Sequence, residues 1–182
     1  MTPRFTAFVR AVNVGTTNRI KMADLAGLFV EAGCEDVSWH LQAGNMLFAA
    51  DAPDGPEALA GRIEAVLAGR GMRRADVMLW TTAELSEFVA LDPFAGIDPD
   101  ALRRCVVFMR RPPTATPTEK LLRAGAEVRH LDDRVLCYTL PSQIGAREMG
   151  DIAIDRPWGT PSTMRWWNVV ADVAAKAAAD ES

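Results

Sequence analysis

Residues 5–22, which read FTAFVRAVNVGTTNRIKM, decide the first part of the fold. Residues 5–14 are mostly apolar and β-prone, which predicts a central strand. A polar loop containing Gly15 follows, and Met22 begins a run of apolar residues at helical spacing. This order of strand, glycine-bearing loop and helix start brings backbone N–H groups and cationic side chains to one point. Proteins hold anions in this way.

The residues that follow extend this beginning to a βαββαβ unit. The helix of residues 22–32 has Gly33 at its natural C′ position, and the turn Ala43-Gly44-Asn45 joins short strands at 37–41 and 46–50. Pro56 and Glu57 begin a second helix, and residues 76–80 form a fourth strand. This element order is that of ferredoxin-like folds.

The second half repeats this order weakly. Thr81 and Glu84 form a capping box for a short helix, and turn residues and prolines at 92–100 mark a boundary. We then expect, in chain order, a strand at 104–110, a helix at 116–125, strands at 127–131 and 135–140, an irregular segment at 142–159, and a last helix that begins at Thr160-Pro161. The prediction is an α+β protein with two subdomains, residues 1–91 and 101–182, whose C-terminal helix packs back on the first.

Composition limits the classes of function. The formal charge of −4 argues against a general nucleic-acid coat, so any contact with nucleic acid needs a local patch. The three cysteines are odd in number and form no CxxC pair, and we interpret them as reduced core residues. No apolar leader or membrane-length run occurs, which predicts a cytoplasmic protein without membrane contact. With two histidines, no metal site or other cofactor is predicted.

The ferredoxin-like topology predicts a cluster of polar residues. Because the first and third strands are antiparallel neighbours, the loop after the first strand lies beside the hairpin that ends the second. Two glycines in these segments would let a ligand approach the backbone, and the amide and cationic side chains would bind it. The predicted ligand-binding residues are Arg10, Asn13, Gly15, Asn18, Lys21, Gln42, Gly44 and Asn45. An alternative interpretation is a polar loop whose asparagines bind their own backbone while Arg10 forms a salt bridge.

Three motifs resemble a known family. The first motif is RAVNVG at residues 10–15 with NRIKMADL at 18–25, which resembles R-G-I-N-V-G followed by N-x-I-K-M-x-D-L. The second is HLQAGN at residues 40–45, which resembles Y-I-Q-S-G-N, and the third is TMRWWNV at residues 163–169, which resembles T-x-R-N-W-N-T. All three family patterns are those of the domain of unknown function 1697 family. The resemblance spans nearly the whole chain. It implies an α+β protein with two related subdomains, and it implies no activity.

The chain departs from the family motifs at several polar positions. His40 replaces a tyrosine, Ala43 a serine, Trp166 an asparagine and Val169 a threonine, and the usual Ser-Lys pair is missing near residues 146–148. A member with these changes would lack any reaction that the family shares, or would use a different ligand. We expect the five tryptophans to fill the core.

We therefore predict a binding module for an anionic ligand at the end of the first sheet. The ligand would be a nucleotide, a phosphorylated metabolite or a nucleic-acid end, and Arg165 and Asn168 would close the site. One alternative is an enzyme that acts on such a ligand by phosphoryl or acyl transfer, although the sequence contains no recognisable catalytic constellation. Another is a structural or interaction protein in which the motif residues brace the two halves.

Overall fold

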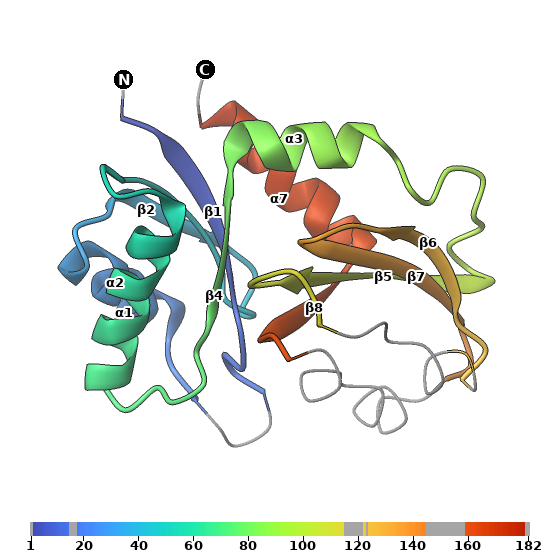
Figure 1. The fold of residues 1–182 in the computed structure, drawn as a ribbon, viewed down its shortest axis with the longest axis horizontal. Coiled ribbons are helices and arrows are strands. Elements are labelled where there is room, and N and C mark those ends of the chain that lie inside the picture. The colour runs from blue at the N-terminus through green and yellow to red at the C-terminus, as the bar shows by residue number, and fades with distance from the viewer. Residues whose placement is uncertain (1, 15–17, 115–121, 123, 145–158, 181–182) are drawn as a thin grey trace. The chain divides into compact units, whose positions relative to one another are not determined.

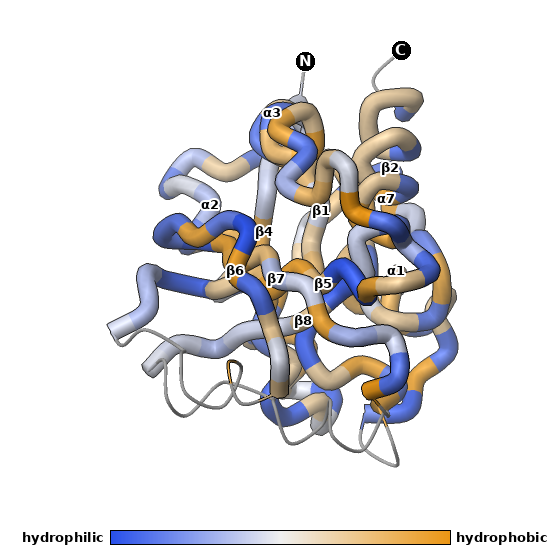
Figure 2. Tube along the Cα trace, turned by 90° about the vertical axis from the view of Figure 1, so that its right-hand side faces the viewer, coloured by the Kyte–Doolittle hydropathy of each residue, from blue (hydrophilic) through white to orange (hydrophobic). Residues whose placement is uncertain are grey.

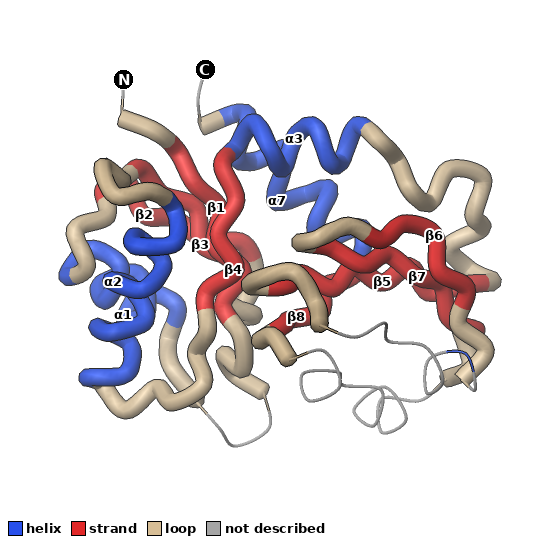
Figure 3. The backbone as a smooth tube through the Cα atoms, viewed as in Figure 1, coloured by secondary structure: helices blue, strands red, loops and turns tan. Residues whose placement is uncertain are grey.

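The computed structural model describes residues 2–14, 18–114, 122, 124–144 and 159–180 (Figure 1). The chain divides into two compact units, Met1–Ala90 with Asp172–Ser182, and Leu91–Ala171. Each unit contains a four-stranded antiparallel sheet, drawn in red in Figure 3. Within the described residues, no helix has the length and apolar character that crossing a membrane requires.

The first unit follows the predicted βαββαβ order, and its sheet has the strand order β2-β3-β1-β4. Its elements are β1 (Arg4–Val9), α1 (Met22–Glu31), β2 (Glu35–His40), β3 (Asn45–Ala49), α2 (Pro56–Gly69), β4 (Val77–Thr81) and α3 (Thr82–Ala90). The capping box of α3 is confirmed, since the Thr81 N–H donates to Glu84 Oε2 at 2.8 Å and the Glu84 N–H donates to Thr81 Oγ1 at 3.1 Å.

The core of the first unit lies between one face of its sheet and helices α1 and α2. Alternate β1 residues, Phe5, Ala7 and Val9, pack there against Leu25 of α1 and Ile63 of α2. Figure 2 shows the trace of β1 mostly in apolar colours. The opposite face is also buried, and helix α3 contacts it along β1 and β4. Burial of both faces explains why residues 5–9 form an almost continuous apolar run.

The second unit has the strand order β6-β7-β5-β8. Its strands are β5 (Leu102–Met109), β6 (Glu127–Leu131), β7 (Val135–Pro141) and β8 (Ser162–Trp166), and α7 (Trp167–Ala179) begins in this unit. Its core contains Cys105, Val107, Leu136 and Tyr138 from one face of the sheet. The helix expected at 116–125 falls almost entirely outside the described residues, as does most of the irregular segment at 142–159.

The two sheets repeat one topology strand for strand. The order β2-β3-β1-β4 becomes β6-β7-β5-β8 when each strand is replaced by the strand four places later. Backbone hydrogen bonds repeat as well: Val9 N–H donates to the Gly44 carbonyl and Met109 N–H to the Arg134 carbonyl, both at 2.8 Å. Residue 9 of β1 thus corresponds to residue 109 of β5. The expectation of a second, related α+β subdomain is confirmed.

The beginning of the last helix differs from the prediction. Residues 162–166 do not continue a helix from Thr160-Pro161 but form strand β8, and α7 begins only at Trp167. Pairing with β5 decides this, because Trp166 lies opposite Cys105 and Met164 lies opposite Val107. Arg165 therefore belongs to a strand and Asn168 to the helix that follows it.

Candidate functional site

Arg10, the first predicted ligand-binding residue, pairs with a carboxylate. Its Nη1 atom lies 3.0 Å from Asp76 Oδ2, and its backbone N–H donates to the Asp76 carbonyl at 2.9 Å. Both side chains are about three-quarters buried. These contacts join the end of β1 to the start of β4, so the positive charge of Arg10 is largely compensated within the first unit.

The loop after β1 meets the β2–β3 hairpin, as the topology predicts. Asn13 Nδ2 donates to the backbone carbonyl of Gln42 at 3.0 Å, and Asn13 Oδ1 accepts the Ile20 N–H at 2.9 Å. Asn13 adopts a φ of 54°, a conformation that asparagine tolerates. The Asn13 amide thus holds two backbone segments together, and the Gln42 side chain is exposed beside it.

Gly44 and Asn45 build the hairpin itself. Asn45 is fully buried, and its Nδ2 donates to the His40 carbonyl at 2.9 Å. Gly44 has a φ of 71°, and a Cβ atom there would lie 3.0 Å from Val12 Cγ2. Both residues therefore have a structural reason to be present, independent of any ligand.

Asn18 brings a second cationic segment to this end of the sheet. Its Nδ2 donates to the backbone carbonyl of Arg73 at 2.9 Å. The loops before α1 and before β4 therefore adjoin, and Figure 1 shows both at the lower end of the first sheet. We call this region the strand-end surface; it consists of Arg10, Asn13, Asn18, Arg19, Lys21, Gln42, Arg73 and Arg74.

The strand-end surface carries four exposed cations. Lys21 is the N-cap residue of α1, and it lies exposed with Arg19, Arg73 and Arg74. Among the described residues, neither Lys21 nor either arginine of the β4 loop has an ion-pair partner. Three carboxylates lie near: Asp76 on Arg10, Glu64 on the Val77 N–H at 2.7 Å, and exposed Asp24 in the first turn of α1. Positive charge therefore exceeds negative charge here, in a chain whose formal charge is −4.

Sequence reasoning missed Arg73 and Arg74. The signal that locates them is topological: they precede the strand that pairs with β1, in register Val9 opposite Val77. Any residue just before β4 must therefore lie beside the loop that follows β1. Gly15, the remaining predicted residue of this cluster, lies outside the described residues.

Arg165 and Asn168, the residues predicted to close the site, both belong to the second unit. Arg165 is buried in β8, where Nη1 donates to Thr163 Oγ1 at 2.7 Å and to the Met164 carbonyl at 2.8 Å. Burial lowers the pKa of its guanidinium to about 10. Asn168 is exposed in the first turn of α7.

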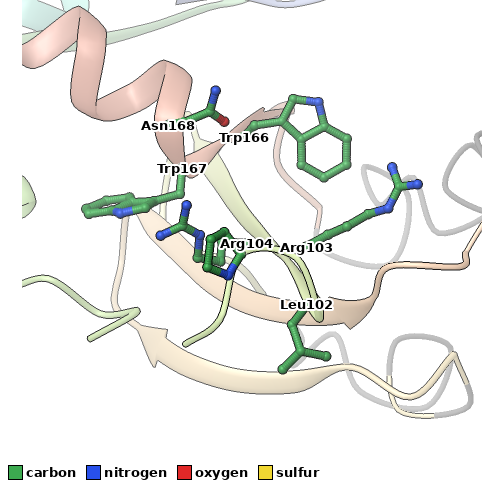
Figure 4. Close-up of a pocket in the computed structure, with 7 residues that line it drawn as sticks. Leu102, Arg103, Arg104, Trp166, Trp167 and Asn168 are labelled. Carbon is green, nitrogen blue, oxygen red and sulfur yellow. The ribbon is translucent and has the colours of Figure 1, made fainter. Parts of the chain in front are cut away.

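A pocket of about 250 Å³ in the second unit contains Asn168. Its other lining residues are Pro99, Leu102, Arg103, Arg104, Trp166 and Trp167 (Figure 4). We call this site the Trp–Arg pocket. Trp166 and Trp167 thus line this pocket, while Trp167 is also buried against Phe94 and Trp166 packs against the core of the second unit.

The candidates for nucleophilic and metal chemistry are the three cysteines, which are all buried, and any clusters of metal-ligating side chains. Burial raises the pKa of Cys34 to about 11 and that of Cys105 to about 12, and it raises the pKa of Cys137 further. These thiols are therefore protonated at neutral pH. Across the described ranges, no group of three histidine, cysteine, aspartate or glutamate side chains has an arrangement that could hold a metal ion.

Comparison with known proteins identifies the family. The model of the family described as protein of unknown function (DUF1697) matches residues 1–136. The chain belongs to this family. The matched range includes every strand-end residue and ends within β7, so it covers the whole first sheet and part of the second.

A solved structure has the same fold as this DUF1697 member. The conserved bacterial protein SP0830 from Streptococcus pneumoniae is 15% identical, with a TM-score of 0.69. The match covers 97% of this chain and 99% of that protein. No curated protein matches the chain.

Proposed function

We propose that this DUF1697 member binds an anionic ligand at the strand-end surface, and that the ligand is an extended phosphate chain such as the end of a single-stranded nucleic acid. The observation that carries the proposal is the hydrogen bond from Asn18 to the Arg73 carbonyl at 2.9 Å. It brings Arg73 and Arg74 beside the loop that carries Arg19 and Lys21. Four exposed cations from two distant segments suit several phosphates in series.

The engagement of the amide groups favours a phosphate chain over a small enclosed ligand. The side-chain amides of Asn13, Asn18 and Asn45 all donate to backbone carbonyls. They are committed to holding loops, so directional recognition of a base has few donors here. Binding through lysine and arginine to phosphates is instead electrostatic, and it depends little on nucleotide sequence.

A structural role is the second candidate for the buried part of the motif. The ion pair between Arg10 and Asp76, together with the amide bonds of Asn13 and Asn45, braces three loops at one end of the sheet. This role accounts for the motif residues without a ligand. It does not account for the exposed arginines before β4, which make no described ion pair.

Fluorescence anisotropy with a labelled, 5′-phosphorylated single-stranded oligonucleotide tests the proposal. We expect wild type to bind, and Arg73→Ala/Arg74→Ala to bind about tenfold more weakly, since two phosphate contacts are lost. Arg70→Ala is the matched control, because Arg70 already pairs with Glu31 at 2.8 Å. Absence of binding by wild type, or equal weakening by the control, would contradict the proposal.

A further inference from the structure

The Trp–Arg pocket lies where β5 begins, β8 ends and α7 starts. It belongs wholly to the second unit, separate in sequence from the strand-end surface. Its lining residues include two arginines, two tryptophans and one asparagine, and none of them carries a carboxylate. Asp98 and Asp100 flank Pro99, but Asp98 Oδ1 accepts the Asp100 N–H at 2.9 Å and neither residue lines the pocket.

Arg103 is held in place within the pocket. Its Nε donates to the Ser142 carbonyl at 3.0 Å, and its guanidinium carbon lies 5.5 Å from the centre of the Trp166 ring. The contact follows from the register, because Trp166 lies opposite Cys105 and Arg103 is two residues before Cys105 on the same face. Arg104 is the next residue of β5, so its side chain leaves the opposite face of the sheet, and Figure 4 shows the two guanidinium groups pointing apart.

Arg104 corresponds to Arg4 of the first unit, but among the described residues it lacks the acidic partner that Arg4 has. Arg4 lies opposite Ala49 and Arg104 lies opposite Thr139, so the two arginines correspond. Arg4 Nη1 lies 3.4 Å from Asp36 Oδ2, on the edge strand β2.

The equivalent edge strand of the second unit has an apolar residue at that position. Glu35 pairs with Ala49 and Glu127 pairs with Thr139, so the residue after each, Asp36 and Val128, also correspond. Arg104 makes no ion pair with any described residue. The charge of Arg104 is therefore not compensated by an ion pair like the one between Arg4 and Asp36.

The helix beside the pocket has also lost an acidic residue. Phe5 lies opposite Thr81 and Cys105 lies opposite Trp166, which aligns the start of α3 with the start of α7. The first turn of α3 contains Glu84, whereas the first turn of α7 contains no acidic residue and has Val169 at the equivalent position. The positive end of the α7 dipole thus adds to the charge of Arg104.

We infer that the Trp–Arg pocket binds a small phosphate monoester that carries a flat unsaturated ring, such as a nucleoside 5′-monophosphate. The Arg104 guanidinium and the positive end of α7 offset the charge of a phosphate monoester, which is about −1.5 to −2 at pH 7. Leu102, Pro99 and the indoles provide the apolar half of the lining, against which the ring would pack.

Isothermal titration calorimetry tests this inference with adenosine 5′-monophosphate, adenosine and inorganic phosphate. Wild type should bind the monophosphate, and should bind adenosine and phosphate at least tenfold more weakly. Arg104→Ala should lower the affinity for the monophosphate about tenfold. No binding of the monophosphate, phosphate binding as tight as that of the monophosphate, or unchanged affinity in Arg104→Ala would overturn the inference.

A second variant tests the same point without removing a pocket residue. Val128→Asp restores the carboxylate that the first unit has at Asp36, at a position that is 47% exposed. It should weaken monophosphate binding, whereas Leu131→Asp, which adds the same charge on the same strand, should not. Equal weakening by the two variants would overturn the inference.

The two proposed sites are separable. Arg73→Ala/Arg74→Ala should leave monophosphate affinity unchanged, and Arg104→Ala should leave unchanged the affinity for an oligonucleotide that has no terminal phosphate. Loss of monophosphate binding in the strand-end variant would overturn the assignment of that ligand to the Trp–Arg pocket.

Discussion

The side-chain amide of Asn18 donates to the backbone carbonyl of Arg73 at 2.9 Å, across 55 residues of sequence. This bond connects the loop that follows β1 to the loop that precedes β4. Asn18 adopts a φ of 48°, a left-handed conformation that asparagine tolerates better than a branched residue does. The cations of both loops thereby belong to one surface.

Asn18→Gly tests the tether without changing charge. Glycine accepts the positive φ of residue 18 but cannot donate to Arg73. We expect a stability loss of about 1 kcal/mol from the lost hydrogen bond, measured by urea unfolding, and weaker oligonucleotide binding in anisotropy. Wild-type affinity in this variant would show that the tether does not position the cations.

The Arg10–Asp76 ion pair should contribute measurably to stability. A double-mutant cycle with Arg10→Ala and Asp76→Ala should give a coupling energy of about 1 kcal/mol, because both side chains are mostly but not fully buried. The single variant Arg10→Ala should cost more, since it leaves a mostly buried carboxylate without its partner. A coupling energy near zero, measured by urea unfolding, would contradict the view that this ion pair braces the loops.

Gly44→Ala should be more destabilising than Gly33→Ala. Both glycines have positive φ, at 71° and 85°, but only at Gly44 would a Cβ meet neighbours, with Val12 Cγ2 at 3.0 Å and the Val9 carbonyl oxygen at 3.1 Å. We expect about 1 kcal/mol for Gly33→Ala and about 2–3 kcal/mol for Gly44→Ala. Equal losses in urea unfolding would mean that the hairpin relaxes to admit a side chain.

Stability should decline in alkali because of Cys34. Burial raises the pKa of this thiol to about 11 from its usual 9.0, and Arg62 opposes the shift. Between these values the unfolded chain loses the thiol proton while the folded chain keeps it, so the free energy of unfolding falls as pH rises. Urea unfolding at pH 8 and pH 10.5 measures the fall, and Cys34→Ala should reduce it. If the free energy of unfolding falls equally in Cys34→Ala, other titrating groups cause the fall.

Local patterns were sufficient to predict the first unit. Apolar spacing predicted α1, and Gly33 marked its end, where Cys34 N–H donates to the Phe29 carbonyl at 3.0 Å. The pair Thr81 and Glu84 predicted the start of α3. These signals lie within a few residues of the features that they specify, so a single sequence contains them.

Pairing between distant strands was beyond the reach of local patterns. Residues 162–166 suit a helix or a strand, and only the vacant edge of β5 selects the strand. Arg103 meets Trp166 through the same register. Arg73 and Arg74 were missed for a related reason, because their position depends on which strand flanks β1. The positions of the candidate site residues therefore depend on strand pairing, whereas the helices and strands of the first unit follow from local sequence.

The salt dependence of oligonucleotide binding tests most directly whether the strand-end cations act as one phosphate-binding surface. The logarithm of the affinity should fall linearly with the logarithm of salt concentration, by roughly 0.7 per phosphate contact for a single strand. Removing Arg73 and Arg74 together should therefore reduce the slope by about 1.4, while Arg70→Ala leaves it unchanged. A slope that is the same in wild type and in Arg73→Ala/Arg74→Ala would contradict the account.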